Sequence, residues 1–236
     1  MTRNLLITTI GKDNKLADWL NGDKNFDVAL VNYDGHNVYK SIMRDVSFCY
    51  TFPTFKYPGI YKLANVNPLI SDYDYYFMPD EDIYITCDDI NRLFARTREM
   101  KLDLSCPSIE ESAISFPSWT IFKHQDKTDI VYTNFVEVMC PVFSKKAFDL
   151  CLPSFNKSQS GWGIDLVWPK IIGDMGSNIA VIHSITARHT RKIGAGNLYH
   201  KLNSMDIKPS VERKRLMAEY GISSIDISEH DRRVGH

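Results

Sequence analysis

The acidic triplet Asp80, Glu81 and Asp82 is the first feature whose residue types and spacing suit chemistry. It follows the apolar segment 75–78 (YYFM), which predicts a buried strand, so the carboxylates should emerge at the carboxyl edge of a sheet. Ligands bind at that edge in open α/β sheets. Two carboxylates held close together favour a divalent cation between them, and such an ion can hold a substrate diphosphate. A solvated acidic turn is the alternative interpretation.

A second candidate is the sequence Gly161-Trp162-Gly163-Ile164-Asp165. Glycines let the backbone approach a ligand closely, and an indole offers an apolar face to a sugar ring. A carboxylate beside that face could take a proton from an acceptor hydroxyl. The alternative is a tight turn with Trp162 in the core and Asp165 capping the next helix.

A third candidate is His189, which lies between Arg188 and Arg191, with Lys192 close behind. A neutral imidazole can complete a divalent-metal shell, and flanking cations suit a diphosphate leaving group. A basic surface turn explains the same residues. We expect the nearby His183 to be structural.

Strands that alternate with helices must position these groups. The pattern predicts strands at 5–10, 26–31, 75–78, 102–105, 120–123, 130–132, 135–139 and 178–182. It predicts helices at 13–20, 58–70, 88–100, 144–151, 164–173 and 211–220, with Asp88 or Asp89 capping the third and Ser144 the fourth. The charged last residues should be frayed. We expect an α/β fold with a mostly parallel central sheet flanked by helices and an irregular second half.

Composition narrows the function classes. A net charge of −1 over 236 residues leaves no electrostatic footprint for non-specific nucleic-acid binding. No apolar segment approaches the roughly 20 residues of a membrane span, and the apolar segment near the N-terminus is shorter than a signal peptide requires. The five cysteines are odd in number and lack metal-ligand spacing. These features predict a cytoplasmic protein with free thiols.

The order of the three candidates resembles the GT-A fold of nucleotide-sugar-dependent glycosyltransferases. The segments YDYYFMPDEDI, LDLSCPSI, NFVEVMCPVFS and GWGIDL resemble successive blocks of the domain of unknown function 707 family, which is regarded as glycosyltransferase-like. NLLITTIG and VNYDG fit the same scheme, so the resemblance covers residues 4–194. It implies a Rossmann-like glycosyltransferase domain over residues 1–200, followed by a helical tail, 201–236, packed on or extending from it.

The resemblance also implies roles for individual residues. Asp80 and Asp82 match the outer positions of a DxD motif, in which the first contacts ribose or metal and the last binds metal. His189 matches the histidine that completes the metal shell, and Asp165 matches the catalytic base. Because this motif has one acid where many have two, Glu137 is a reserve base. Further implied donor-binding residues are Thr8, Asp34, Lys62, Arg188 and Arg191.

The implied reaction is sugar transfer from a nucleotide diphosphate sugar to a hydroxyl acceptor, with Mn²⁺ or Mg²⁺ bridging the phosphates. Trp162, Gly163 and Trp119 would shape the acceptor site. Two alternatives remain at this stage. A nucleotidyltransferase would use the same carboxylates and release pyrophosphate, and a non-catalytic protein of this fold would bind the nucleotide without turnover.

The cysteine pattern gives a first testable prediction. Thiol titration of the denatured, unreduced protein should find all five cysteines reactive. A result of one or three reactive thiols would indicate disulfides and contradict the cytoplasmic assignment.

Overall fold

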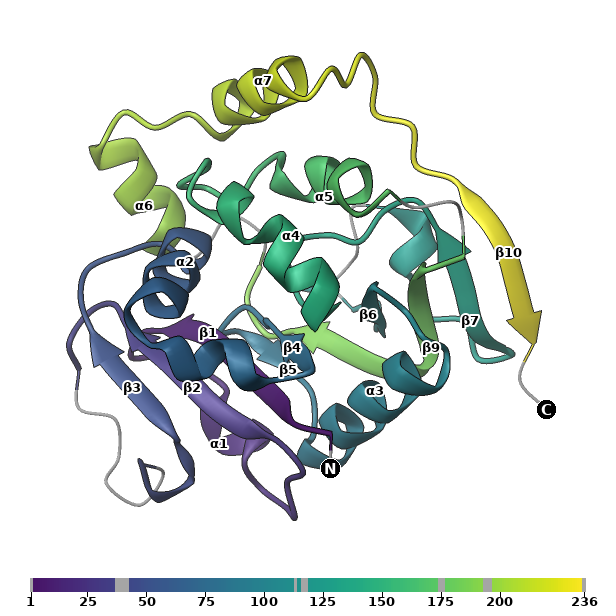
Figure 1. The fold of residues 1–236 in the computed structure, drawn as a ribbon, viewed down its shortest axis with the longest axis horizontal. Coiled ribbons are helices and arrows are strands. Elements are labelled where there is room, and N and C mark those ends of the chain that lie inside the picture. Colours follow the sequence, from purple (N-terminus) through teal and green to yellow (C-terminus); the bar gives the residue numbers. More distant parts are fainter. Residues whose placement is uncertain are drawn as a thin grey trace.

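The computed structural model describes residues 2–36, 43–112, 114–115, 119–173, 177–192 and 197–234. Its centre is one 10-stranded sheet in the order β10-β7-β9-β6-β8-β4-β1-β2-β3, with β5 paired to β9 (Figure 1). The strands are β1 (Asn4–Ile10), β2 (Asp27–Asn32), β3 (Phe48–Thr51), β4 (Tyr75–Phe77), β5 (Ile83–Tyr84), β6 (Leu104–Ile109), β7 (Thr128–Thr133), β8 (Val142–Ser144), β9 (Ile179–His189) and β10 (Glu229–Val234).

The direction of the strands brings several carboxyl ends to one edge. β1 pairs in parallel with β2 and β4, and β2 pairs in parallel with β3. β8 is antiparallel to both β4 and β6, and β6 is parallel to β9, so β6 and β9 run in the same direction as β1. The segments that follow β1, β2, β4 and β9 therefore all leave the sheet at the same edge. This largely parallel sheet, flanked by helices, confirms the predicted α/β class.

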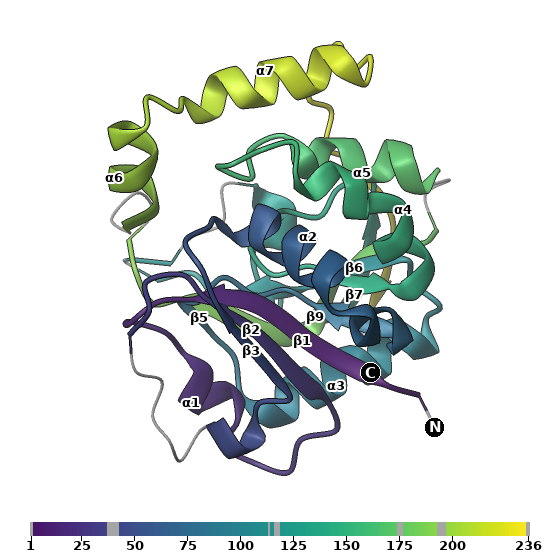
Figure 2. The same ribbon diagram turned by 60° about the vertical axis from the view of Figure 1, so that its left-hand side comes forward.

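Helices cover both faces of the sheet (Figure 2). One face carries α2 (Lys56–Val66), α4 (Lys145–Phe155) and α5 (Ile164–Ile172), and the other carries α1 (Leu16–Trp19) and α3 (Cys87–Glu99). Aromatic rings join the first layer to the sheet: Trp168 lies with its ring centroid 4.9 Å from Phe143 and 5.5 Å from Tyr57. This packing fixes the start of α2 and the start of α5 relative to the sheet edge.

Three local predictions are wrong. Residues 120–123 contain the short 3-10 helix Thr120–Phe122 instead of a strand. Residues 135–139 form an irregular loop, although Phe135 and Val136 are buried as a strand would require. The N-cap of α3 is Thr86, whose hydroxyl accepts a hydrogen bond of 3.1 Å from the Asp89 amide. The predicted cap Ser144 is confirmed at α4.

The C-terminal segment contains helices and a strand. α6 (Asn197–Ser204) includes the expected boundary at residue 200, and α7 (Pro209–Glu219) lies over α5 in Figure 1. The last described residues form β10, antiparallel to β7, instead of a frayed end. Backbone pairing stabilises this charged strand, and the Thr133 hydroxyl donates to the Ser228 carbonyl at 2.8 Å.

Two further observations concern the whole described chain. Every helix within these ranges falls short of the length and apolarity that a membrane crossing requires. All five cysteines are free thiols, and four of them are buried.

Candidate functional site

A cavity of about 310 Å³ lies at the carboxyl edge of the sheet. Among the described residues, its lining comes from the ends of β1 and β9, from the segments after β2, β4 and β9, from the start of α2, from the 137–139 loop, from residues 159–162 and from α6. All three sequence motifs therefore reach one cavity, through segments that are far apart in the chain.

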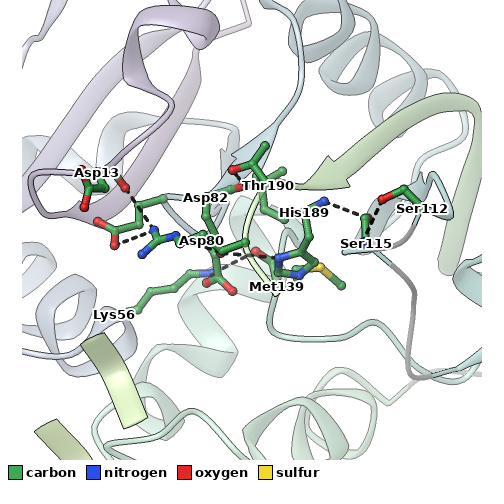
Figure 3. Close-up of polar contacts among 12 residues, drawn as sticks. Asp13, Lys56, Asp80, Asp82, Ser112, Ser115, Met139, His189 and Thr190 are labelled. Carbon is green, nitrogen blue, oxygen red and sulfur yellow. Dashed lines mark hydrogen bonds and ion pairs between the residues drawn. The ribbon is translucent and has the colours of Figure 1, made fainter. Parts of the chain in front are cut away.

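Asp80 lies on the cavity next to a lysine that the sequence did not reveal. The Lys56 ammonium donates to Asp80 Oδ1 at 2.7 Å and to the Val138 carbonyl at 2.7 Å (Figure 3). The Asp80 amide donates to the Met139 carbonyl at 2.7 Å. Burial and the neighbouring Asp82 raise the pKa of Asp80, while Lys56 opposes that rise. Lys56 therefore fixes the 137–139 loop against the acidic triplet.

The Glu81 carboxylate accepts hydrogen bonds from three separate segments of the protein. The donors are the Gly11 amide, the Tyr33 hydroxyl at 2.8 Å and the Arg191 guanidinium at 2.8 Å. These donors follow β1, β2 and β9, respectively. Burial raises the pKa of Glu81, whereas these donors favour its charged form. Glu81 thus joins the ends of three strands.

Asp82 and His189 are brought together by β5. This short strand pairs Ile83 with His189, and Thr190 donates from its amide and its hydroxyl to the Asp82 carbonyl. His189 Nδ1 lies 3.6 Å from Asp82 Oδ2, and Arg191 Nε lies 3.4 Å from the same oxygen.

The electrostatics of this pair favour an ionised carboxylate. Burial opposes the charge of Asp82, but His189 and Arg191 outweigh it and lower the pKa of Asp82. Burial likewise lowers the pKa of His189, but Asp82 and Asp80 raise it more. His189 Nδ1 is buried and has no hydrogen-bond partner among the described residues. A cation bound at this nitrogen would replace the proton that the raised pKa favours.

Two buried carboxyl groups lie beside these residues. Glu137 lines the cavity, and its Oε2 atom is buried without a hydrogen-bond partner in the described structure. Burial and then the charge of Asp165 raise the pKa of Glu137 to about 7. Asp165 is 9% exposed, does not line the cavity and accepts a hydrogen bond from the Leu166 amide at 3.0 Å. Burial raises the pKa of Asp165 to about 7 as well.

Another part of the lining comes from residues 158–163, which we call the tryptophan loop and of which Gln159, Ser160, Gly161 and Trp162 reach the cavity. Trp162 is 36% exposed and lines the cavity. Gly163 has φ of 91°, and a Cβ atom there would lie 2.8 Å from Arg213 Cα, so glycine is required for the loop to pass beneath α7. The turn interpretation is thus correct for the backbone, while the indole still faces the cavity.

The structure places several other predicted residues away from the cavity. Thr8 is fully buried and donates to the Pro79 carbonyl, and Asp34 accepts from the Lys12 amide and from His36. Lys62 and Arg188 lie over the rings of Phe52 and Tyr84, and Trp119 packs on Phe135. His183 is fully buried in β9, and Gly163 lies just behind the lining residues. Arg191 is at the site as predicted.

Sequence reasoning missed residues that reach the cavity from distant elements. α6 contributes Leu198, Tyr199 and Lys201. The Lys201 ammonium lies 4.8 Å from the Phe55 ring centroid and donates to the Thr54 carbonyl. Nothing in the local pattern of α6 marks these residues. Lys56 lies two residues before the predicted helix 58–70, and the structure makes it the first residue of α2.

The ligand set predicted for a metal is only partly assembled. In the described ranges, no three His, Cys, Asp or Glu side chains lie close enough together to hold an ion. Asp82 and His189 are adjacent, but Asp80 is engaged by Lys56. The unpartnered His189 Nδ1 and the ionised Asp82 fit a hard cation that takes its other ligands from water and from a substrate phosphate.

The contacts of Glu81 generate a stability prediction. Glu81→Gln should lower the free energy of unfolding by roughly 1–3 kcal/mol, because buried donors lose a charged acceptor. Glu99→Gln is the matched control, since Glu99 pairs with Arg96 at a side-chain exposure of 64%, and it should change stability by less than about 0.5 kcal/mol. Chemical denaturation measures both. Equal effects of the two substitutions would contradict the central role of Glu81.

Solved structures with the same fold come from S. aureus TarS. One TarS chain superposes with a TM-score of 0.52 at 11% identity, covering 93% of this chain and 43% of that one. The chain thus spans less than half the length of that TarS chain. A shorter TarS chain in complex with UDP-GlcNAc gives a TM-score of 0.53 at 11% identity, covering 93% and 71% of the two chains. Its complex with UDP gives 0.51 at 12% identity, covering 93% and 70%.

At these identities the likeness establishes the fold alone. A search of functionally curated proteins finds no significant match. A family match is found for residues 66–228, which are most of the chain and include the acidic triplet, the tryptophan loop and α7. The chain therefore belongs to DUF707, a family described as proteins of unknown function.

Proposed function

We propose that this protein is a glycosyltransferase that transfers a sugar from a nucleotide diphosphate sugar to a hydroxyl acceptor, with a divalent cation. The observation that carries the proposal is the convergence of an acid–histidine pair, cationic side chains, a carboxyl group with a raised pKa and an exposed indole on one cavity. TarS, which shares the fold, binds UDP-GlcNAc and UDP in its crystal structures, and this supports a nucleotide-sugar donor.

The donor's diphosphate would lie at the acidic triplet. Asp82 and His189 would hold the cation, which would supply stabilisation of the charge that develops on the departing nucleoside diphosphate. Arg191 and Lys192 also line the cavity there and would face the phosphate oxygens. Asp80, held by Lys56, lies beside this pair and would contact the ribose or the cation.

The acceptor hydroxyl would lose its proton to Glu137, which lines the cavity whereas Asp165 does not. The resulting oxygen would form a bond to the anomeric carbon. The bond between that carbon and the leaving phosphate oxygen would break on the opposite side, which inverts the configuration at the carbon. Asp165 lies behind Glu137, where its charge helps to keep the pKa of Glu137 near 7. Trp162 would offer its apolar face to the acceptor.

Donor binding is tested by calorimetry with UDP-GlcNAc and with UDP, each with and without Mn²⁺. Asp82→Asn should weaken the Mn²⁺-dependent binding by about tenfold or more, because it removes a charged ligand of the cation. Asp126→Asn, at a side chain that is 95% exposed, should bind like the wild type. Unchanged Mn²⁺-dependent affinity in Asp82→Asn would refute the cation site. Binding of nucleoside triphosphates with pyrophosphate release would favour a nucleotidyltransferase instead.

Slow hydrolysis of UDP-GlcNAc, with water as acceptor, tests the base. Glu137→Gln should lower the rate by about 10²–10⁴-fold while donor affinity changes little. In the wild type the rate should rise with pH through about 7 as Glu137 loses its proton, and this rise should disappear in the variant. Asp165→Asn should shift the pH–rate profile to lower pH without abolishing the rate, because the charge of Asp165 raises the pKa of Glu137. The opposite result, with Asp165→Asn inactive and Glu137→Gln active, would make Asp165 the base.

A further inference from the structure

We propose that Glu212 of α7 is a positioning residue that holds the tryptophan loop, and with it Trp162, in the geometry needed on the acceptor side of the cavity. The catalytic part of this inference rests on the proposed glycosyltransferase function, whereas the positioning itself does not. Nothing in the sequence pattern marks Glu212, because it lies on a mostly polar helix 49 positions after Gly163.

Both carboxylate oxygens of Glu212 bind the loop. Oε1 accepts from the Gln159 amide at 2.8 Å, and Oε2 accepts from the Ser160 amide at 2.8 Å. Oε2 also lies 3.0 Å from the Ser158 hydroxyl, which donates to it. These donors lower the pKa of Glu212 despite its partial burial, so the carboxylate is ionised at neutral pH. A charged acceptor on two successive amides is a strong local restraint.

The restraint passes on to the indole in two ways. Ser160 Oγ accepts a hydrogen bond from the Trp162 amide at 3.1 Å, so the residue that Glu212 holds also holds Trp162. The neighbouring Arg213 places its guanidinium carbon 5.4 Å from the centre of the Trp162 ring. The close approach of Gly163 to the Arg213 backbone leaves no room for the loop to shift toward α7.

α7 is itself anchored independently of Glu212. Leu216 is fully buried in the core, and Glu219 forms an ion pair with Lys157. Removing the Glu212 carboxylate should therefore release the loop without detaching the helix. Because Gln159, Ser160 and Trp162 line the cavity from a segment separate from the acidic triplet and His189, the loss should fall on acceptor-side chemistry rather than on donor binding.

The experiment compares Glu212→Gln with Glu219→Gln, a matched change about two turns further along α7, whose carboxylate pairs with Lys157 and makes none of the contacts to the Gln159 and Ser160 amides. Hydrogen exchange should speed up at the Gln159 and Ser160 amides in Glu212→Gln only, and acrylamide quenching of Trp162, isolated by difference against Trp162→Phe, should increase. The kcat for UDP-GlcNAc hydrolysis should fall by about 10- to 100-fold with the donor affinity unchanged. The reason is that the tryptophan loop, which orders the acceptor (water in this assay), is displaced. Glu219→Gln should match the wild type in exchange, quenching and kcat, because the fully buried Leu216 still anchors α7 and the contacts of Glu212 are intact.

Unchanged exchange and quenching in Glu212→Gln would overturn the positioning role. Loss of UDP-GlcNAc affinity together with kcat would place the loop on the donor side and overturn the assignment to the acceptor. If Glu212→Gln does not fold, Glu212→Asp, which keeps the charge on a shorter side chain, should show the same pattern at smaller size. If the wild type binds no nucleotide sugar, the proposed function fails, and exchange and quenching still decide the positioning role.

Discussion

The arrangement of the site depends on one buried carboxylate, that of Glu81. A carboxylate can stay charged in the protein interior only if donors and a cation satisfy it. Glu81 meets this need with the Gly11 amide, the Tyr33 hydroxyl and the Arg191 guanidinium, which follow β1, β2 and β9. Three strand ends are thereby held at one point. With Glu81 fixed, Asp80 meets Lys56, and Asp82 meets His189.

The two sides of the cavity are built differently. The acidic triplet, His189 and Arg191 stand on the ends of paired strands, so the hydrogen bonds of the sheet define their positions. The tryptophan loop has no strand beneath it and is instead held from outside, by Glu212 and Arg213 of α7. The 137–139 loop connects the sides, since Lys56 and Tyr57 both donate to the Val138 carbonyl.

Much of the fold and the acidic half of the site could be predicted from local pattern. The apolar segments at β1, β2 and β4 and the amphipathic α3 are regular enough to be recognised without tertiary information. The loop at 135–139 was assigned as a strand from its largely apolar sequence, but the buried Phe135, Val136 and Met139 belong to a core loop. Lys62 was chosen on the correct helix, whereas the residue at the site is Lys56, because nothing local indicates which turn of α2 lies at the sheet edge.

The sequence by itself determined the α/β class, the acidic triplet at a strand end and the convergence of Asp80, Asp82 and His189 on one edge, because parallel strands must present their carboxyl ends together. Only the tertiary structure decided that Glu137 rather than Asp165 lies on the cavity, that α6 completes its lining while α7 holds the tryptophan loop, and that the charged C-terminal residues form β10. Each of these outcomes depends on contacts between segments tens of residues apart, and local periodicity carries no information about such pairings.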